Sequence, residues 1–170
     1  QFINFIDHLH SASDDLGAAR MLGENDNVIR IMSIHKSKGL EFPVVILAGL
    51  GKQFNFSDIN PPVLFHKDLG LGPRYVDPCT RTYSDTIARL AMKKRIKLEN
   101  LSEEMRILYV GCTRAQEKLI LVGSQSKLEK AAQRWVRGVD PFWVAQGRSF
   151  LDWIALVLIH HPDGGQLREL

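Results

Sequence analysis

The chain has 170 residues, of which 45% are hydrophobic and 24% charged, proportions typical of a globular domain rather than a disordered or fibrous chain. Its 22 basic residues nearly balance 19 acidic ones, and a net charge of +3 permits a nucleic-acid partner without requiring one. Two distant cysteines, Cys79 and Cys112, make a disulfide framework or zinc ribbon a poor fit, so we expect a reducing, cytoplasmic setting and no membrane partner.

The first part of the chain has two different patterns. Residues 1–10 place Phe2, Ile6 and Leu9 on one helical face, whereas residues 11–27 are rich in Ser, Asp, Asn and Gly, as in a connection. There is no starting methionine and no basic-then-apolar leader. We therefore expect the sequence to be a piece of a longer protein.

Two apolar runs then predict strands, at residues 28–34 and 42–47. The first is β-branched and apolar except at Arg30 and Ser33. The second is nearly continuous, which predicts a strand buried on both faces. The intervening residues 35–41 are too few for a full crossover helix, so a tight loop with one helical turn is expected.

Residues 49–82 contain many prolines and glycines, which predicts a long irregular excursion with short extended pieces at 63–65 and 74–76. From Ser84 onward the apolar residues follow a 3.6-residue period, which predicts a long helix. Ser102 is placed to cap a second helix that restarts there.

The last part of the chain predicts one more strand and two helices. Residues 117–123 form an apolar run that is typical of a strand. Residues 128–136 and 149–159 have the periodicity of amphipathic helices, joined by a linker with Gly, Pro and Trp.

The segment Gly49-Leu50-Gly51-Lys52 has some likeness to a phosphate-binding loop, but it lacks the required spacing. A P-loop needs two glycines five positions apart and a Ser or Thr after the lysine to ligate magnesium. Here Ile46 stands where the first glycine belongs, and Gln53 follows Lys52. We therefore expect that this chain does not bind a nucleotide triphosphate without other parts of the protein.

The loop at 35–41 has the residues of a nucleotide contact. Gly39 permits close backbone approach of a phosphate, and Glu41 has the chemistry to accept hydrogen bonds from ribose hydroxyls. The alternative is an ordinary polar turn that contains a glycine. Composition alone favours that alternative, because short motifs often match by chance.

Arg114 stands between a predicted helix and a predicted strand. A rigidly mounted guanidinium at such a junction can grip a γ-phosphate and neutralise charge in the transition state, as arginine fingers do. The alternative is a salt bridge to Glu103 or Glu117. The residues in isolation support both interpretations equally.

Other basic and aromatic residues have simpler interpretations. The run Lys93-Lys94-Arg95 with Lys97 is more typical of a solvated helix face than of a phosphate track. The three tryptophans lie at helical spacing, which favours a core over base stacking: Trp135, Trp143 and Trp153. The histidines lack metal-ligand spacing, so no metal site is predicted.

Taken together, residues 31–45 (IMSIHKSKGLEFPVV) and 103–115 (EEMRILYVGCTRA) resemble motifs V and VI of UvrD/Rep-type superfamily-one DNA helicases. Residues 64–72 (LFHKDLGLG) and 75–78 (YVDP) resemble a narrower group, the A subunits of bacterial AddAB ATP-dependent helicase/nucleases. The resemblance covers roughly residues 1–160.

The resemblance implies an α/β fold: part of a RecA-like (P-loop NTPase-like) second helicase lobe, with parallel strands flanked by helices and a helical C-terminal extension. It implies the end of an upstream helical domain and a connection at 1–26, the lobe at 27–125, and an extension toward a downstream domain at 126–170.

The resemblance also implies roles for matching residues. Glu41 would bind the ATP ribose, Gly39 would lie near the γ-phosphate, and Arg114 would be the arginine finger. Three residues of the loop would face single-stranded DNA: Ser33, His35 and Lys36.

The implied partners are single- and double-stranded DNA and the B subunit of a heterodimer, in double-strand break repair and recombination. ATP and Mg²⁺ would be bound mainly by other parts of the protein, because the Walker A lysine and acidic Mg²⁺ box are absent here. The 170 residues alone are expected not to hydrolyse ATP.

Three alternatives remain open from the sequence. One is a UvrD-like helicase without a nuclease, which the residues after Leu170 would decide. Another is a degenerate lobe that clamps DNA or protein without an ATPase role. The third is a module that serves only for interaction.

Overall fold

The computed structural model describes residues 28–165 of a chain that forms two compact units, residues 1–32 and 33–170. The helical stripe expected over residues 1–10 and the connection at 11–27 lie outside the described residues. The strand predicted at 28–34 is wrong, since residues 28–33 have no regular structure. Ile29 and Ile31 are 96% and 98% exposed. β-branched residues alone do not make a strand without a neighbour to pair and pack against.

A parallel pair of strands confirms the α/β class. Strand β1 (Phe42–Leu47) pairs with β5 (Ala115–Leu121), and Val45 lies opposite Leu119. The predicted burial of both faces of β1 is wrong, because Ile46 is 61% exposed whereas Leu47 is 8% exposed. In the described part of the chain β1 has one neighbouring strand, and helix packing covers only its Leu47 face.

The loop before β1 contains a short helical turn, as expected. The 3₁₀ helix η1 (Ile34–Ser37) is capped by Ser33, whose side chain accepts a hydrogen bond from the Lys36 N–H. Gly39 follows with φ of +85°, a conformation that side chains disfavour.

The predicted irregular excursion instead contains an antiparallel sheet. Its order is β2 (Val63–His66), β3 (Gly70–Asp77) and β4 (Thr82–Asp85), so consecutive strands are neighbours. The extended pieces expected at 63–65 and 74–76 are confirmed. Some of these residues lie in the turns of a meander, such as Pro78 between β3 and β4, whereas Gly72 and Pro73 lie within β3 itself. The strands of a meander pair locally and need no distant partner.

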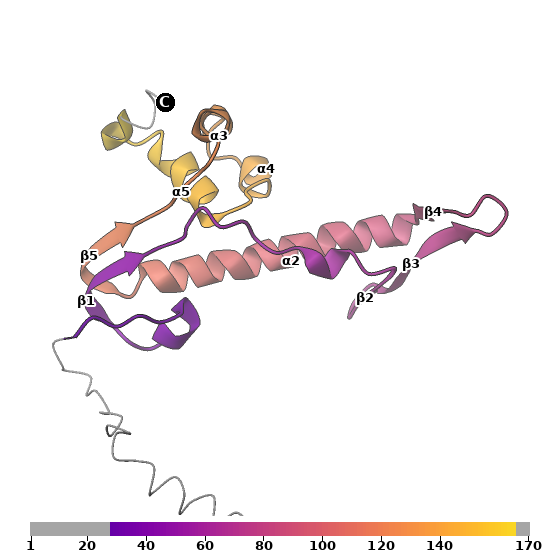
Figure 1. Cartoon of the computed structure of the whole chain (residues 1–170), viewed down its shortest axis with the longest axis horizontal. Coiled ribbons are helices and arrows are strands. Elements are labelled where there is room, and N and C mark those ends of the chain that lie inside the picture. Colours follow the sequence, from indigo (N-terminus) through magenta and orange to yellow (C-terminus); the bar gives the residue numbers. More distant parts are fainter. Residues whose placement is uncertain (1–27, 166–170) are drawn as a thin grey trace, which may run out of the picture. The chain divides into compact units, whose positions relative to one another are not determined.

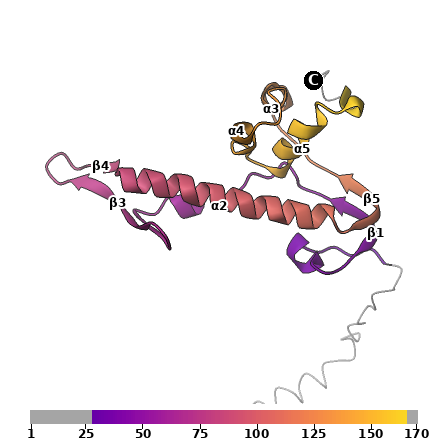
Figure 2. The ribbon, with the colours of Figure 1, turned by 180° about the vertical axis from the view of Figure 1, so that it is seen from behind.

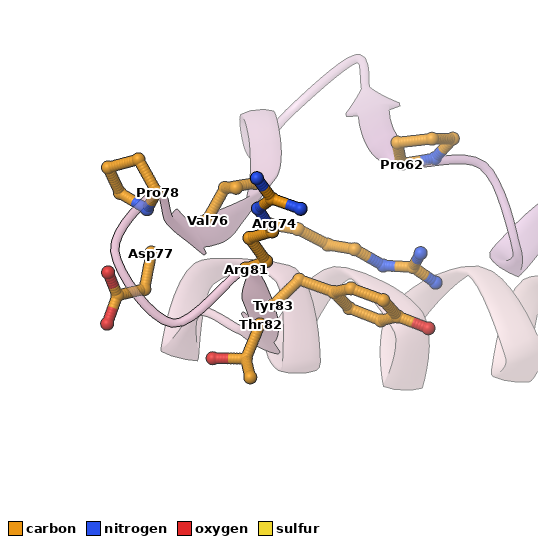
Figure 3. Close-up of a pocket in the computed structure, with 8 residues that line it drawn as sticks. All are labelled: Pro62, Arg74, Val76, Asp77, Pro78, Arg81, Thr82 and Tyr83. Carbon is orange, nitrogen blue, oxygen red and sulfur yellow. The ribbon is translucent and has the colours of Figure 1, made fainter.

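This sheet has a hollow on its surface, with a volume of about 380 Å³. Figure 3 shows the hollow at the β3–β4 turn. A second 3₁₀ helix, η2 (Ser57–Ile59), precedes the sheet in the chain.

Helix α2 (Ile87–Cys112) begins beside β4 and ends just before β5 (Figure 1). Thr86 caps it by accepting a hydrogen bond from the Arg89 N–H, at 3.2 Å. The predicted long helix is confirmed, but the restart at Ser102 is wrong. Ser102 lies inside one continuous helix of 26 residues. The surrounding Leu, Lys, Glu and Met residues favour continuation over a new cap.

The C-terminal part is helical, as expected: α3 (Leu128–Trp135), α4 (Pro141–Val144), α5 (Phe150–Leu158) and the short η3 (Pro162–Gly164). The three α-helices gather beyond the carboxyl end of β5 (Figure 1 and Figure 2). No helix in residues 28–165 has the length and apolar character needed to cross a membrane.

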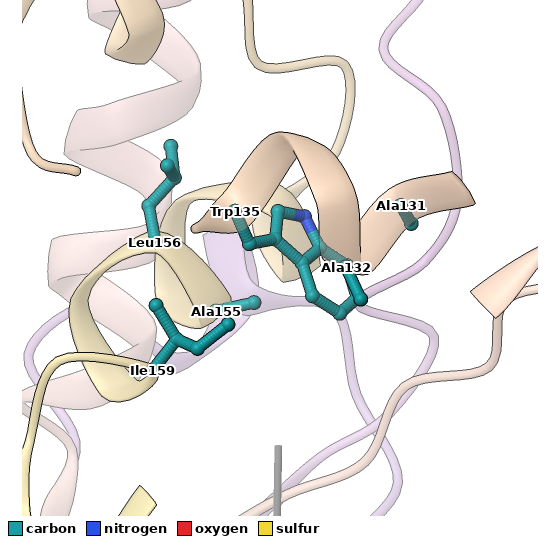
Figure 4. Packing of buried hydrophobic residues seen from close by; sticks show 6 residues of the cluster. All are labelled: Ala131, Ala132, Trp135, Ala155, Leu156 and Ile159. Carbon is teal, nitrogen blue, oxygen red and sulfur yellow. The ribbon is translucent and has the colours of Figure 1, made fainter. Parts of the chain in front are cut away.

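A small core joins α3 to α5 (Figure 4). Trp135 is 2% exposed, and its indole N–H donates to Asp152 Oδ1 at 2.9 Å. Trp153 is 6% exposed. The predicted core role is thus confirmed for these two tryptophans. The buried cluster comprises Ala131, Ala132, Trp135, Ala155, Leu156 and Ile159.

Candidate functional site

The pairing of β1 with β5 brings together two segments that are far apart in the sequence. Phe42 lies opposite Ala115, and the Phe42 N–H donates to the carbonyl oxygen of Arg114 at 2.9 Å. Parallel strands place their amino ends at one edge of a sheet. The loop that carries Glu41 and the junction that carries Arg114 therefore meet at this edge, which we call the motif edge (residues 33–42 and 113–116).

Arg114 is half-buried, and its guanidinium binds to the chain around it. Nη1 donates to the carbonyl oxygen of Leu40, Nε to that of Val110, and Nη2 to Thr113 Oγ1, each at 3.1 Å. A guanidinium has five N–H donors. The remaining N–H groups of Arg114 make no hydrogen bond within residues 28–165. The side chain is thus anchored to both segments, with donors to spare.

The salt bridges considered for Arg114 are not formed in the described structure. Glu103 pairs with Arg106 at 2.8 Å, one turn away on α2. Glu117 is exposed and has no ion pair to Arg114. The anchoring partners are two backbone carbonyls and the Thr113 hydroxyl, which no charge pattern in the sequence would have indicated.

Glu41 is exposed at the same edge. The Gln116 side-chain amide donates to Glu41 Oε2 at 3.0 Å. Within the described part of the chain, Oε1 of Glu41 accepts no hydrogen bond and no ion pair joins Glu41 to Arg114. An exposed carboxylate and an anchored guanidinium thus lie on adjacent strand ends without neutralising each other.

The residues predicted to face DNA lie on or beside η1. Ser33, His35 and Lys36 are all exposed. Buried Ser37 holds the turn from inside, because its hydroxyl donates to the Ile34 carbonyl oxygen at 2.7 Å. The structure therefore places the three side chains in solvent, on the same loop that ends at Glu41.

Helix α2 contacts this loop through a glycine. A Cβ at Gly111 would lie 3.4 Å from Ile34 Cδ1 and 3.1 Å from Leu47 Cδ1. The last turn of α2 thus packs against η1 and β1 together. This packing links the loop, the strand and the Arg114 junction in one local unit.

Residues 2–126 match the family described as the UvrD-like helicase C-terminal domain. The chain belongs to this family. The match contains both segments that meet at the motif edge, and it confirms the resemblance to UvrD-type helicases seen in the sequence.

The chain is also similar to large bacterial proteins, each named as the A subunit of an ATP-dependent helicase/nuclease. The identity is 60% over 169 residues with the protein from Alkaliphilus oremlandii, 60% over 170 with that from Syntrophomonas wolfei, and 55% over 176 with that from Clostridium novyi. In each case the match covers 99% of this chain and 14% of the relative. The chain thus spans about one seventh of their length.

The UvrD-like domain contains a buried arginine that sequence reasoning missed. Arg89 is 0% exposed, and its Nε donates to Asp85 Oδ1 at 2.8 Å. The other guanidinium N–H groups donate to four backbone carbonyl oxygens, those of Ile59, Asn60, Pro62 and Gly72. Arg89 fastens α2 to the antiparallel sheet. Its i,i+4 spacing from Asp85 was the one available signal.

The basic run on α2 is paired rather than arranged as a continuous track. Lys93 pairs with Asp85, and Arg95 pairs with Glu99 at 2.8 Å. Lys97 lies over the Phe56 ring, 5.8 Å from its centroid. These contacts agree with the predicted solvated face.

Two further sequence predictions concern phosphate and metal binding. The segment 49–52 forms a turn, in which the Lys52 N–H donates to the Gly49 carbonyl oxygen at 3.0 Å. Among residues 28–165, no group of three His, Cys, Asp or Glu side chains is arranged to hold a metal ion. Cys79 and Cys112 are both free thiols.

Proposed function

We propose that this chain is part of the second motor lobe of an ATP-dependent DNA helicase/nuclease. In this proposal the lobe occupies residues 27–125, after the end of a helical domain, and residues 126–170 extend toward a downstream domain. The single observation that carries the proposal is the Arg114–Leu40 hydrogen bond at 3.1 Å. It ties the arginine of one helicase motif to the residue that precedes Glu41 in the other.

Two side chains at the motif edge have the chemistry to bind different groups of ATP, the ribose and the γ-phosphate. Glu41 is exposed and keeps a carboxylate oxygen for a ribose hydroxyl, and Arg114 keeps guanidinium donors for the γ-phosphate. Gly39 has φ of +85° and open space where a Cβ would stand, so backbone can lie near a phosphate there. Arg114 would stabilise the negative charge that develops on the transferred group.

The DNA role is assigned to the exposed side of η1. Ser33, His35 and Lys36 supply hydrogen-bond donors, and Lys36 a positive charge, for a single strand. The same loop continues directly to Glu41. A change in the position of Glu41 when ATP binds would shift η1, and with it the hold on DNA. This coupling is the basis of the proposed translocation in break repair and recombination.

The rest of the ATP site is assigned to other parts of the protein. In this proposal Mg²⁺ is held by ATP and by residues beyond this chain, and the described residues contain no cluster of three His, Cys, Asp or Glu side chains placed to bind a metal. The large relatives are each named as one subunit of an enzyme, which supports a partner B subunit. We expect the 170 residues alone to show no DNA-stimulated ATP hydrolysis.

Replacing Arg114 tests the proposal. In the full-length protein, Arg114→Ala should lower the rate of DNA-stimulated ATP hydrolysis by about 10³-fold or more and leave ATP affinity nearly unchanged. Arg114→Lys should also be slow, because an ammonium lacks the planar donor array. Arg106→Ala is the matched control, since it removes an exposed arginine of α2 and should not alter turnover. Full turnover in Arg114→Ala would contradict the proposal.

One observation favours the alternative of a clamp without ATPase role. The three hydrogen bonds of the Arg114 guanidinium are those of an arginine that holds local structure. Two cavities in the described part of the chain also lie away from the motif edge, one on the antiparallel sheet and one beside α3 and α5. A clamp predicts that Arg114→Ala weakens folding or DNA affinity while the rate of ATP hydrolysis survives.

A further inference from the structure

The hollow on the antiparallel sheet has the chemistry of a ligand site. Its lining includes Arg74, Arg81 and Tyr83, with Pro62 and Val76 as apolar wall. Several of the lining residues are exposed, so the hollow opens to solvent. Two guanidinium groups and an aromatic ring therefore share one open cavity of about 380 Å³.

Acidic side chains do not cancel the positive charge of this hollow. Asp77 is directed away from Arg74 and Tyr83 (Figure 3), and its Oδ1 accepts hydrogen bonds from backbone N–H groups of its own turn, at 2.8 and 3.4 Å. Asp85 is shared among three cations, because Arg74, Arg89 and Lys93 all pair with it. Arg89 and Lys93 lie outside the lining, so the charges of the hollow itself are those of Arg74 and Arg81 against Asp77. Arg81 has no ion pair among residues 28–165, and the hollow therefore keeps a positive charge that suits an anion.

Tyr83 adds a stacking surface beside these charges. Tyr83 is 68% exposed, and the guanidinium carbon of Arg74 lies 4.9 Å from the centroid of its ring. Arg74 and Tyr83 are held together from neighbouring strands, since β3 pairs with β4. Exposed aromatic rings beside cations are how proteins bind single-stranded nucleic acid, with the base on the ring and the phosphate on the cation.

Arg81 occupies a strained position in the turn that closes the hollow. Its φ is +54°, and it is the one residue other than glycine with positive φ among residues 28–165. Glycine or asparagine would take this conformation more easily. Strain at a ligand-facing residue is a sign that the side chain itself is needed.

We propose that the hollow at the β3–β4 turn binds single-stranded nucleic acid, with a phosphate on Arg81 and a base on Tyr83. The proposal rests on the DNA-binding function proposed above, and it adds a second contact away from the motif edge. Helix α2 separates the two places, and 26 helical residues span about 39 Å. An acidic peptide would use the cations but not the ring, so nucleic acid fits the hollow better.

The test measures binding of a fluorescein-labelled oligo-thymidine to the full-length protein over a range of salt concentrations. We expect Arg81→Gly to weaken binding about three- to tenfold and to reduce the slope of log affinity against log salt by about 0.7, the value for one lost phosphate contact on a single strand. Arg81→Gly also relieves the positive φ, so it should unfold at the same temperature as the parent or higher. Loss of binding then cannot be attributed to misfolding.

Matched variants separate the parts of the site. Lys94→Ala removes an exposed charge of the same sign from α2 and should leave affinity and slope unchanged. Tyr83→Phe should bind like the parent, whereas Tyr83→Ala should lose affinity with no change in salt slope, because stacking releases no counterions.

Four other outcomes would overturn the proposal, and each has a different cause. If Arg81→Gly bound oligo-thymidine as tightly as the parent protein, the proposed contact at the hollow would be wrong. The Arg114 experiment would still test the proposed ATP site. Equal losses in Arg81→Gly and Lys94→Ala would indicate general charge attraction only. A labelled polyglutamate that loses affinity in Arg81→Gly while oligo-thymidine does not would assign the hollow to an acidic protein segment. Failure of the parent protein to bind oligo-thymidine would remove the proposed DNA function as well.

Discussion

The two ends of α2 each carry an arginine that bonds to backbone carbonyls, and the two arginines differ in what they leave free. Arg89, near the first turn, is 0% exposed and uses Nε and both terminal nitrogens on five acceptors. Arg114, just after the last turn, is half-buried and makes three hydrogen bonds. A guanidinium with every donor satisfied can only hold structure, whereas one with spare donors at an exposed edge can also take a ligand.

Replacing each arginine in turn tests whether the two differ in this way. Arg89→Ala should lower the free energy of unfolding by about 3–5 kcal/mol, because four carbonyl oxygens lose the buried guanidinium that donates to them, although Asp85 keeps Arg74 and Lys93. Arg114→Ala should cost about 1–2 kcal/mol, since its bonds lie at a partly solvated edge. Urea unfolding of both variants followed by circular dichroism gives the two values. Equal losses would show that Arg114 is as structural as Arg89.

Two glycines extend the comparison to the backbone. A Cβ at Gly72 would lie 2.6 Å from Met92 Sδ and 3.1 Å from Arg89 Cα. Gly72→Ala should therefore push the sheet from α2 and cost about 1–3 kcal/mol. At Gly39 a Cβ would meet nothing within 4 Å, and only the φ of +85° opposes a side chain.

Gly39→Ala should thus cost about 1–2 kcal/mol, with a smaller loss for Gly39→Asn, because asparagine tolerates positive φ. The same unfolding experiment distinguishes the two cases. If Gly39→Asn lowered the free energy of unfolding as much as Gly39→Ala, a steric contact of the side chain rather than the positive φ would explain the need for glycine.

A third prediction uses the acid dependence of stability at the Arg89 end. Hydrogen bonds from Lys93, and then from Arg89, hold the pKa of Asp85 below its ordinary value. A carboxylate with a lowered folded-state pKa stabilises the fold above its unfolded pKa, and this contribution is lost as pH falls through the folded pKa. Thermal unfolding should therefore show Asp85→Asn less stable than the parent near pH 7. The two should converge at low pH, and a constant difference down to low pH would contradict this role.

The smallest expected effect on folding is at the other end, at Glu41. Its exposed contact with Gln116 should be worth less than about 0.5 kcal/mol, so Glu41→Gln should unfold like the parent. In the full-length protein we expect the same variant to weaken ATP binding about tenfold, the effect of losing one hydrogen bond to a charged group. Gln116→Ala is the control, because it removes the neighbour of Glu41 and leaves the carboxylate. Unchanged ATP affinity in Glu41→Gln would argue against the ribose contact.

Local sequence signals predicted most of the elements. The continuous run at 42–47, the helical period after Ser84 and the two C-terminal amphipathic patterns correspond to β1, α2, α3 and α5. Such patterns need only neighbouring residues to be read. The predictions that were wrong or incomplete concern features that depend on contacts between distant residues or on strand register. Residues 28–34 have strand composition but no strand, and the turn-rich region at 49–82 contains a meander whose pairing depends on register.

The order of residues alone identifies the two helicase-like segments, the residue types at Glu41 and Arg114, and the lack of a P-loop at 49–52. That the two segments meet follows from the parallel pairing of β1 with β5, which is seen only in the folded chain. The folded chain also decides which arginine has every N–H donor bonded, because the carbonyl partners lie up to 30 residues from Arg89 and up to 74 residues from Arg114. Every residue has a backbone carbonyl, so the residue types in a sequence do not indicate which carbonyl an arginine binds, and only the folded structure shows it.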